Sequence, residues 1–365
     1  MIKKFTVMFL AMCAMICVLF AGVYLYKNIR SIYMSAIPVQ ECKDKETFDL
    51  KKQSKVKKYH NNGKIEHIIF SVPEERGSQK NILRKGILVT RAHARATIVI
   101  CHGFMCNKND VSFLRSIFYD YNVMVFDFRA HGENSENQCS SFGFNEVLDL
   151  EGAVAFIKSK PGLAALPLIG YGFSMGAVTA ILAQAQHPDM FSALVLDCPF
   201  DSTEMVIHRL IERLTFTVGG YTYGLPGRNL LKKYAYNHSV QAMIKYALRA
   251  VAHIGTHDIQ LCIIPSDTVN EIKKVTVPCF FITCKNDDKA PVDAARAIYA
   301  NKPGYKRLWL TNGRLHFDSF FYNPEKYTHK VRSFIKKFLD GELKNKTESK
   351  IVEDIDDPFV HKEVS

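Results

Sequence analysis

The chain has 365 residues, 47% of them hydrophobic, which is ordinary for a globular protein and enough for a sizeable core in one large domain or two small ones. Its formal net charge of +12 would suit an anionic surface. The lysines, which are dense over residues 51–58, have no interleaved aromatic residues and no nucleic-acid motif, so nucleic-acid binding is not expected.

The first 30 residues predict a membrane segment. Residues 5–26 contain no charged side chain, and Lys3, Lys4, Lys27 and Arg30 flank them. A helix of ~20 apolar residues spans a bilayer, and the end of this run matches a signal-peptidase site poorly. We therefore expect an uncleaved, single-pass transmembrane helix, with a cleaved signal as the alternative. A signal anchor would make the following domain extracytoplasmic. The polar, lysine-rich residues 31–62 predict a tether.

Strands and helices alternate between residue 63 and about residue 340. The apolar patterns predict strands over 65–72, 86–92, 96–101, 123–128, 193–198, 278–284 and 307–310, and helices over 111–119, 145–158, 292–299 and 324–339. A further strand and helix flank residue 174. This alternation predicts an α/β domain with a mostly parallel central sheet and helices on both faces.

Two segments depart from the alternation. Residues 201–273 are too long for a plain connection, are rich in apolar and aromatic residues, and predict a mostly helical insertion. An insertion here would overhang the carboxyl ends of the strands, where open α/β sheets bind ligands, so we expect a lid. The alternative is a packing element without substrate contact. Residues 341–365 are charged and aperiodic, which predicts a disordered tail.

Ser174 stands between Gly172 and Gly176, after an apolar strand and before an apolar helix. This is the G-x-S-x-G pattern of a nucleophile elbow in its expected strand–turn–helix context. The turn must be sharp to present the hydroxyl, and glycine avoids the collisions that a Cβ would cause there. The pattern therefore predicts that Ser174 is a nucleophile.

A nucleophilic serine needs a histidine base oriented by a carboxylate, and in this topology the acid precedes the histidine. Asp287 follows the strand over 278–284, and His316 lies in the loop between the last strand and the final helix. We expect Ser174, Asp287 and His316 to form a catalytic triad. Asp288 and Asp197 are the rivals for the acid. His329, in the predicted helix, and His361, in the tail, are less suitable bases.

The oxyanion of such a reaction needs two preorganised N–H donors. We expect them to be the backbone amides of Phe104 and Met175, and expect His102 to be structural. Of the 10 cysteines, Cys101, Cys198, Cys279 and Cys284 lie in predicted core strands as small hydrophobes. Their spacing gives no zinc site and no disulfide framework, so we expect neither a metal nor a cofactor.

Four blocks of sequence resemble the α/β-hydrolase superfamily, and within it the bacterial serine aminopeptidase-like or acyl-peptidase-like hydrolases. They are Cys101–Phe104, Phe126–Ser135, Gly172–Gly176 and Leu196–Ser202. The resemblance spans roughly residues 65–340 and implies the α/β-hydrolase fold, with nucleophile, acid and base at Ser174, Asp287 and His316. Ala130 stands where the family usually has glycine, and Leu315 where a small residue usually precedes the histidine.

These observations predict a membrane-anchored serine hydrolase that cleaves an ester, thioester or amide through an acyl-enzyme. A small acyl-containing or lipid-like molecule is the expected substrate. Two alternatives stay open: an acyltransferase that uses the same triad, and a non-catalytic binding protein that keeps the fold.

Overall fold

The computed structural model describes residues 63–134, 138–213, 215–218, 221–224, 227–234, 260–287, 289–343 and 349–354. Over these ranges, no helix combines the length and the apolar character needed to cross a bilayer. The predicted anchor over residues 5–26 and the tether over residues 31–62 lie outside the described residues.

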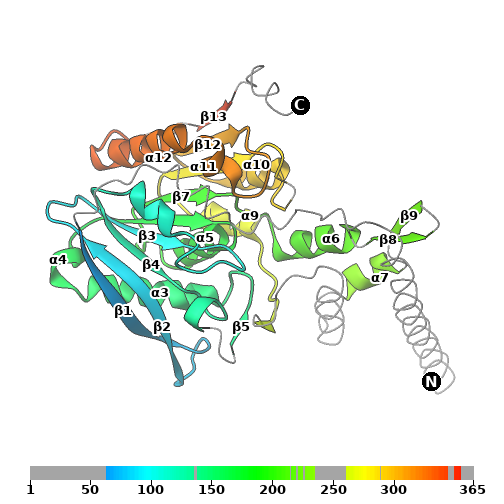
Figure 1. Cartoon of the computed structure of the whole chain (residues 1–365), viewed down its shortest axis with the longest axis horizontal. Coiled ribbons are helices and arrows are strands. Elements are labelled where there is room, and N and C mark those ends of the chain that lie inside the picture. Colours follow the sequence, from blue (N-terminus) through cyan, green and yellow to red (C-terminus); the bar gives the residue numbers. More distant parts are fainter. Residues whose placement is uncertain are drawn as a thin grey trace, which may run out of the picture. The chain divides into compact units, whose positions relative to one another are not determined.

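A nine-stranded sheet forms the centre of the domain (Figure 1). Its strands are β1 (Lys64–Pro73), β2 (Asn81–Thr90), β3 (Thr97–Cys101), β4 (Asn122–Phe126), β6 (Leu168–Phe173), β7 (Ala193–Asp197), β11 (Cys279–Cys284), β12 (Lys306–Thr311) and β13 (Ser349–Glu353). Their order is β1-β2-β4-β3-β6-β7-β11-β12-β13. Pairs β1–β2 and β2–β4 are antiparallel, and the other pairs are parallel.

Helices and short 3-10 turns connect these strands. They are η1 (Ser112–Ser116), η2 (Gly132–Asn134), α3 (Glu146–Lys158), α4 (Pro161–Ala164), α5 (Met175–Gln186), α9 (Thr268–Glu271), η3 (Ile272–Lys274), α10 (Val292–Asn301), α11 (Asp318–Tyr322) and α12 (Pro324–Leu339). Strands β3, β4, β6, β7 and β11 are buried along their whole length. Continuous apolar strands of this kind fit a parallel sheet that is covered on both faces.

Strand β6 shows how the two faces are filled, because successive side chains of a strand point to opposite sides. Tyr171 contacts the ring of Phe118, which follows η1, and hydrogen-bonds Tyr327 of α12. A Cβ on Gly172, in contrast, would come within 2.5 Å of Ala177 in α5. Helix α5 also packs against α3, α9 and η3. One face therefore carries η1 and α12, and the other carries α3 and α5.

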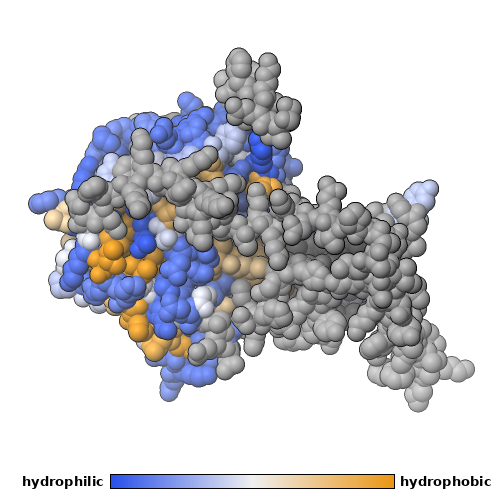
Figure 2. Space-filling view, in the orientation of Figure 1, coloured by the Kyte–Doolittle hydropathy of each residue, from blue (hydrophilic) through white to orange (hydrophobic). Residues whose placement is uncertain are grey.

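The hairpin of β1 and β2 has one face toward the core and one toward solvent. Phe70 and Val72 are buried on the inner face, beside α3. On the outer face, Ile65, Ile69 and Leu83 are 49%, 58% and 59% exposed. Figure 2 shows apolar residues over this hairpin within a largely hydrophilic surface. The strand predicted over residues 65–72 is present as β1, and its buried and exposed residues alternate.

The predicted helix over residues 111–119 is instead a single short 3-10 turn, η1. The side chains of Arg115 and Ser116 donate hydrogen bonds to the backbone carbonyls of Ser112 and Phe113. Local bonds of this kind compete with the regular helical ladder, which explains why the helix does not extend.

The insertion after β7 contains both helices and strands. Its described elements are α6 (Thr203–Arg213), β8 (Thr215–Val218), β9 (Tyr221–Gly224), α7 (Arg228–Lys233) and β10 (Gln260–Leu261). Strands β8 and β9 form an antiparallel hairpin, and β10 pairs in parallel with β5 (Cys139–Ser140). With α9 (Thr268–Glu271), helices still make up more of the described part than strands, so the short strands are an addition to the mostly helical insertion that the sequence predicts.

The C-terminal segment also differs from its prediction. Within the expected disordered tail, residues 349–353 form β13, which pairs in parallel with β12 and is an edge strand of the sheet. Trp309 of β12 donates a hydrogen bond from Nε1 to the Asp354 carboxylate, 3.0 Å away. Lys285 Nζ donates to the backbone carbonyl of Asp354. These polar contacts hold a strand whose own side chains are mostly exposed.

Candidate active site

Ser174 occupies the turn between β6 and α5 with φ 52° and ψ −116°. A positive φ is rare for a residue with a Cβ and is typical of strained functional turns. Both flanking glycines are sterically required. A Cβ on Gly172 would meet the α5 backbone at Ala177, and a Cβ on Gly176 would meet the carbonyl of Cys101. The sequence therefore folds locally into the elbow that its pattern predicts.

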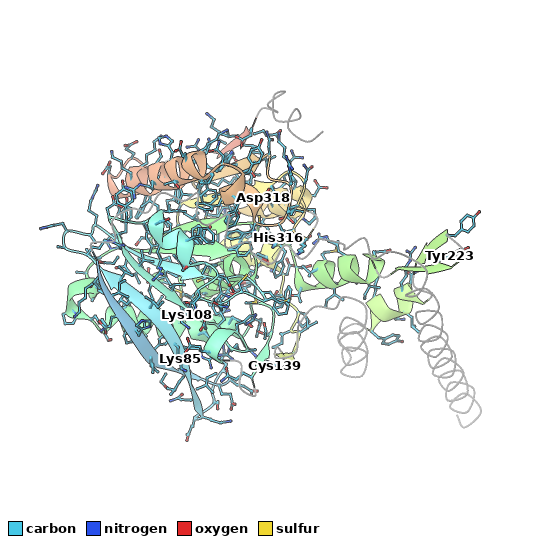
Figure 3. The ribbon with its side chains drawn as sticks, in the orientation of Figure 1. Lys85, Lys108, Cys139, Tyr223, His316 and Asp318 are labelled. Atoms are coloured by element: carbon cyan, nitrogen blue, oxygen red, sulfur yellow. A yellow bond between two sulfur atoms is a disulfide. The ribbon has the colours of Figure 1, made fainter. Side chains whose placement is uncertain are left out.

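His316, which Figure 3 labels near Asp318, hydrogen-bonds both Ser174 and Asp287. Its Nε2 is 2.9 Å from Ser174 Oγ, and its Nδ1 is 2.7 Å from Asp287 Oδ2. Because a carboxylate only accepts, Nδ1 carries the proton and Nε2 can accept one from the serine. The structure thus brings together three residues that are 142 and 29 positions apart in the chain.

The Asp287 carboxylate is held in its ionised form. Burial opposes ionisation, but the hydrogen bond from His316 and the amides of Ala290 and Lys289 outweigh it, so the pKa of Asp287 lies below its usual value. These amides donate to Oδ1 at 2.8 and 2.9 Å, which leaves Oδ2 for the imidazole. The side chain therefore has one orientation, and a negative charge faces His316.

Among the described rivals for the acid and the base, neither Asp197 nor His329 hydrogen-bonds Ser174 or His316 through its side chain. Asp197, at the end of β7, accepts a 2.6 Å hydrogen bond from Tyr327 and a longer one from Tyr171. Burial raises the pKa of Asp197 to about 6. His329 is an exposed residue of α12. Asp288 and His361 fall outside the described residues.

The two amides expected to bind an oxyanion flank the serine. Met175 opens α5 directly after Ser174. Phe104 follows Gly103, where a Cβ would lie 3.4 Å from Ser174 Cβ, so this loop passes beside the nucleophile. Among the described residues, neither amide donates a hydrogen bond. Both remain available to a ligand oxygen, as an oxyanion hole requires.

His102 connects the loop after β3 to the loop after β4. Its Nδ1 donates to the Gly103 carbonyl at 2.8 Å, and its Nε2 accepts from the Phe128 amide at 2.9 Å. Burial, together with the neighbouring His131, lowers the pKa of His102 to about 3. A fully buried, neutral imidazole with both nitrogens engaged is structural, as the sequence predicts.

The loop of Phe104, which passes beside Ser174, contributes its ring to an aromatic group that the sequence does not predict. The Phe142 ring lies between those of Phe104 and Phe200, with centroids 4.8 and 5.4 Å away. Phe200 is buried, whereas Phe104 and Phe142 are partly exposed. On the histidine side, Phe173 lies 5.3 Å from His316 and stacks on Phe317 at 3.6 Å. The side chains around the site are therefore largely apolar and suit an acyl or aryl group.

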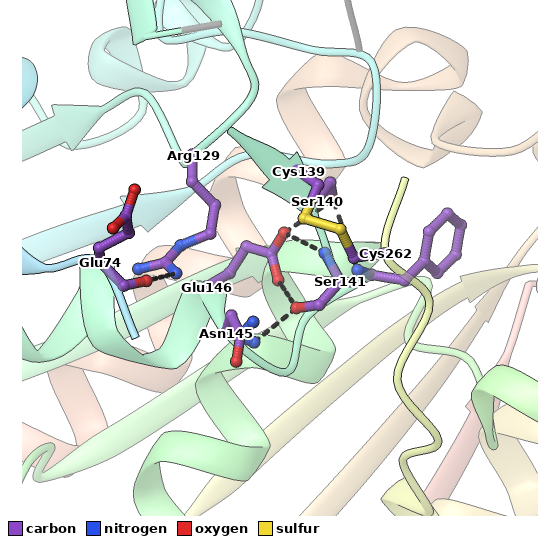
Figure 4. The surroundings of a disulfide bond; sticks show 9 residues. Glu74, Arg129, Cys139, Ser140, Ser141, Asn145, Glu146 and Cys262 are labelled. Atoms are coloured by element: carbon purple, nitrogen blue, oxygen red, sulfur yellow. Dashed lines mark hydrogen bonds between the residues drawn. A yellow bond between two sulfur atoms is a disulfide. The ribbon is translucent and has the colours of Figure 1, made fainter. Parts of the chain in front are cut away.

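A buried carboxylate organises the loop that carries Phe142 (Figure 4). Glu146, at the start of α3, accepts hydrogen bonds from both Ser140 and Ser141 hydroxyls and from the amides of Ser141 and Gly143. Its side chain is fully buried. Ser140 Oγ also lies 3.6 Å from Met175 Sδ. Glu146 therefore fixes the loop against the first turn of α5.

The same loop carries a disulfide, which corrects the expectation that the chain has none. Cys139 and Cys262 are bonded with their Cα atoms 5.5 Å apart, although 123 positions separate them in the chain. Only the parallel pairing of β5 with β10 brings them together. Sequence spacing alone carried no signal of this pair.

One group of possible metal ligands occurs in the described part of the chain: Cys198, Asp287 and His316, with ligand atoms within 4.8 Å of one another. Burial raises the pKa of the Cys198 thiol well above its ordinary value. A protonated thiol is a poor ligand, because metals bind the thiolate. Asp287 and His316 are, moreover, already engaged with each other.

Comparison with known proteins agrees with this architecture. Residues 92–317 match the model of the family described as serine aminopeptidase, S33. The uncharacterised protein YqkD of Bacillus subtilis is 30% identical over 261 residues, which cover 70% of this chain and 76% of that protein. The α/β-hydrolase domain-containing protein WAV2 of Arabidopsis thaliana is 21% identical over 62% of this chain and 64% of its own length.

Two solved structures illustrate the fold. The esterase Pf2001 of Pyrococcus furiosus superposes with a TM-score of 0.56 at 19% identity, covering 76% of this chain and 92% of the esterase. The peroxisomal α/β-hydrolase Lpx1 of Saccharomyces cerevisiae gives a TM-score of 0.54 at 14% identity, over 77% and 91% of the two chains. With this fold and the match over residues 92–317, the chain belongs to the serine aminopeptidase S33 family of α/β hydrolases.

Proposed function

We propose that this protein is a serine hydrolase that cleaves an ester, thioester or amide through an acyl-enzyme on Ser174. The observation that carries the proposal is the continuous hydrogen-bonded path from Ser174 Oγ through His316 to Asp287, at 2.9 and 2.7 Å. Nucleophile, base and orienting carboxylate in this order are the requirements of triad catalysis.

The reaction follows from the positions of these groups. His316 Nε2 takes the proton of Ser174 while Oγ bonds to the acyl carbon, and Asp287 stabilises the resulting imidazolium. The amides of Phe104 and Met175 receive the negative charge on the acyl oxygen. His316 then protonates the leaving group. In the second half of the reaction it activates a water molecule that hydrolyses the acyl-enzyme.

The substrate is proposed to be a small molecule or lipid with an apolar acyl group. The partly exposed rings of Phe104 and Phe142 beside the oxyanion amides support this class. The leaving group has two candidates. The family description, serine aminopeptidase, favours an amine, and the esterase Pf2001, which shares the fold, favours an alcohol.

Membrane anchoring and an extracytoplasmic location complete the proposal. The uncharged run over residues 5–26 supports a single-pass N-terminal anchor. The Cys139–Cys262 disulfide supports the location, because disulfides persist mainly in oxidising compartments. Protease protection of intact spheroplasts or vesicles, with the domain detected by antibody, tests both: digestion from the outside is expected, and full protection would contradict the location.

A fluorophosphonate probe tests the nucleophile directly. The wild-type protein should become labelled at Ser174, and Ser174→Ala should not. Ser202→Ala, a serine two residues beyond Phe200, is the control and should label like the wild type. Hydrolysis of matched p-nitrophenyl esters, acyl thioesters and aminoacyl amides then identifies the leaving group. Absence of labelling in a folded wild-type protein would overturn the proposal.

A further inference from the structure

Four basic side chains gather where α12 lies against the last two strands of the sheet (Figure 1). Arg307 belongs to β12 and Lys350 to β13, while Lys326 and Lys330 are one turn apart on α12. We call these four residues the cation cluster. Arg307 lies near the beginning of β12, whereas His316 follows the other end of that strand. The cation cluster is therefore separate from the candidate active site.

The register of the sheet places Arg307 beside Lys350. The two residues are direct partners in the parallel pair of β12 and β13, so their side chains point to the same face of the sheet. Trp309, two positions after Arg307, also points to this face, and its ring lies 6.0 Å from that of Tyr327 in α12. The face that carries both cations is thus the one that α12 covers.

The two lysines of α12 lie over the same tryptophan. Lys330 Nζ is 5.0 Å and Lys326 Nζ is 6.0 Å from the centroid of the Trp309 ring. Ammonium groups at such distances are attracted to the face of an indole. Because Trp309 is buried, its ring is a fixed support that holds both ammonium groups on the side of Arg307 and Lys350.

The four positive charges are close enough to affect one another. Burial lowers the pKa of Lys330, and the charges of the three other cluster residues lower it further, whereas the Asp354 carboxylate raises it. Among the described residues, Asp354 pairs with only one cluster residue, Lys326, and it also accepts a 3.0 Å hydrogen bond from Trp309 Nε1. Within the same ranges, the three other cluster residues form no ion pair.

Two other basic residues of α12 show the usual arrangement. Arg332 forms a two-pronged pair with Asp120, at 2.7 Å from each nitrogen, and Lys336 pairs with Asp340. The lack of ion pairs in the cluster is therefore not a general property of the helix. Clustered like charges repel one another, and a bound anion would relieve that repulsion.

A phosphate group suits the cluster better than a carboxylate does. A phosphate dianion would compensate two of the unpaired charges, whereas a carboxylate would compensate one. The planar guanidinium of Arg307 can donate two parallel hydrogen bonds to phosphate oxygens, and the ammonium groups of Lys330 and Lys350 act as point charges beside it. Arg307 is partly buried, and its register partner on β11 is the apolar Phe280. An environment with less water strengthens such contacts.

We propose that the cation cluster is a binding site for a phosphate group, carried by a free phosphate compound or by the headgroup of an anionic lipid. Arg307 and Lys350 bind the phosphate oxygens from the sheet, and Lys330 binds them from α12. The Asp354 carboxylate holds Lys326 at the border of the site. The site is independent of the proposed hydrolase function.

The experiment uses the full-length protein in a non-ionic detergent. Trp309 is the only tryptophan of the chain, so its emission reports on the surroundings of the cluster. Inorganic pyrophosphate is the probe for a free phosphate. Micelles that contain phosphatidylglycerol are the probe for a lipid headgroup, and micelles with phosphatidylcholine are the neutral control. We expect a saturable change with at least one of the two probes and none with the control, and the probe that binds identifies the source of the phosphate.

Single substitutions locate the site. Arg307→Ala should weaken binding at least about tenfold, because it removes the two-pronged contact. Lys350→Ala should weaken it about threefold, and since Lys350 is exposed, this variant leaves the core undisturbed. Lys336→Ala removes the same charge from α12 outside the cluster and should bind like the wild type. Isothermal titration calorimetry checks each dissociation constant without fluorescence.

Three results would overturn the proposal. The first is the absence of a saturable response to both phosphate probes in the folded wild type. The second is an equal loss of binding in Lys350→Ala and Lys336→Ala, which would mean that net charge alone attracts the probe. The third is unchanged binding in Arg307→Ala, which would place the phosphate elsewhere.

Discussion

The proposed catalytic triad and the insertion that follows β7 are fixed in different ways. Each group of the proposed triad is held by contacts from separate elements: Ser174 by the elbow, Asp287 by two amides, and His316 by both partners. Among the described residues, the insertion is joined to the rest of the domain by a stem, in which residues 201–203 pair with residues 266–268, and by the Cys139–Cys262 disulfide. The catalytic groups and the residues around the substrate are thus held by different contacts. We therefore expect substitutions in the two regions to change different kinetic parameters.

The largest expected effect comes from removing the base. His316→Ala should reduce kcat/KM by at least about 10⁴-fold, because loss of one triad member disables the unit. His329→Ala, on the exposed side of α12, is the control and should keep wild-type turnover. Steady-state hydrolysis of an activated ester measures both. Turnover near the wild-type level in His316→Ala would show that the serine is activated differently.

Substitutions of Asp287 and Asp197, the two carboxylates at strand ends, should have clearly different effects on activity. Asp287→Asn should lower kcat by about 10⁴-fold. The amides of Lys289 and Ala290 would take the side-chain oxygen, so the NH2 group would face His316 Nδ1 and stabilise the wrong tautomer of the imidazole. Asp197→Asn changes a carboxylate that contacts Tyr327 and Tyr171 rather than His316, so we expect a much smaller loss. Equal losses in the two variants would mean that Asp197 shares the role of the acid.

Asp197 should instead affect stability as a function of pH. Burial raises the pKa of folded Asp197 to about 6, above the ordinary value for an aspartate, so ionisation opposes folding. The penalty is absent below about pH 4 and complete above about pH 6, and it amounts to about 3 kcal/mol. The unfolding free energy of the wild type relative to Asp197→Asn should therefore fall as the pH rises through this window. Denaturant titrations from pH 4 to pH 7 measure the difference, and a constant difference would contradict the assignment.

The smallest effect is expected at the stem. Arg209 of α6 forms a two-pronged ion pair with Asp201, and both side chains are partly buried. Arg209→Ala should lower the unfolding free energy by about 1 kcal/mol and change KM more than kcat. Arg296→Ala removes an exposed pair with Glu353 and is the control, with an expected change below about 0.5 kcal/mol. A loss of kcat in Arg209→Ala would show that the stem affects the chemical step.

Much of the fold and the positions of the site residues could be predicted from the sequence, because they depend on local signals. Ser174 stands in a five-residue pattern whose glycines are required by contacts with the neighbouring backbone. Asp287 follows a strand that is buried along its whole length, and His316 follows a strand whose last four residues are buried. Parallel strands end at the same edge of a sheet, so residues far apart in the chain meet there.

The features that could not be predicted depend on long-range pairing or weak patterns. Cys139 begins the two-residue strand β5, and Cys262 directly follows the two-residue strand β10; strands this short have no periodicity of their own. Strand β13 has only Ile351 and Val352 as apolar residues and is held by contacts of Asp354. Glu146 resembles an ordinary first-turn helix acid in the sequence, and only the fold shows that it is fully buried.

The neutral imidazole of His102 has a consequence for the working range of the protein. It joins the loop of Phe104 to that of Phe128, and its pKa of about 3 lies far below any ordinary growth condition. The position of the Phe104 amide, which we propose as an oxyanion donor, is therefore insulated from acidification. An enzyme exposed to a fluctuating external environment would keep this part of its machinery unchanged, and its acid sensitivity would originate in other groups.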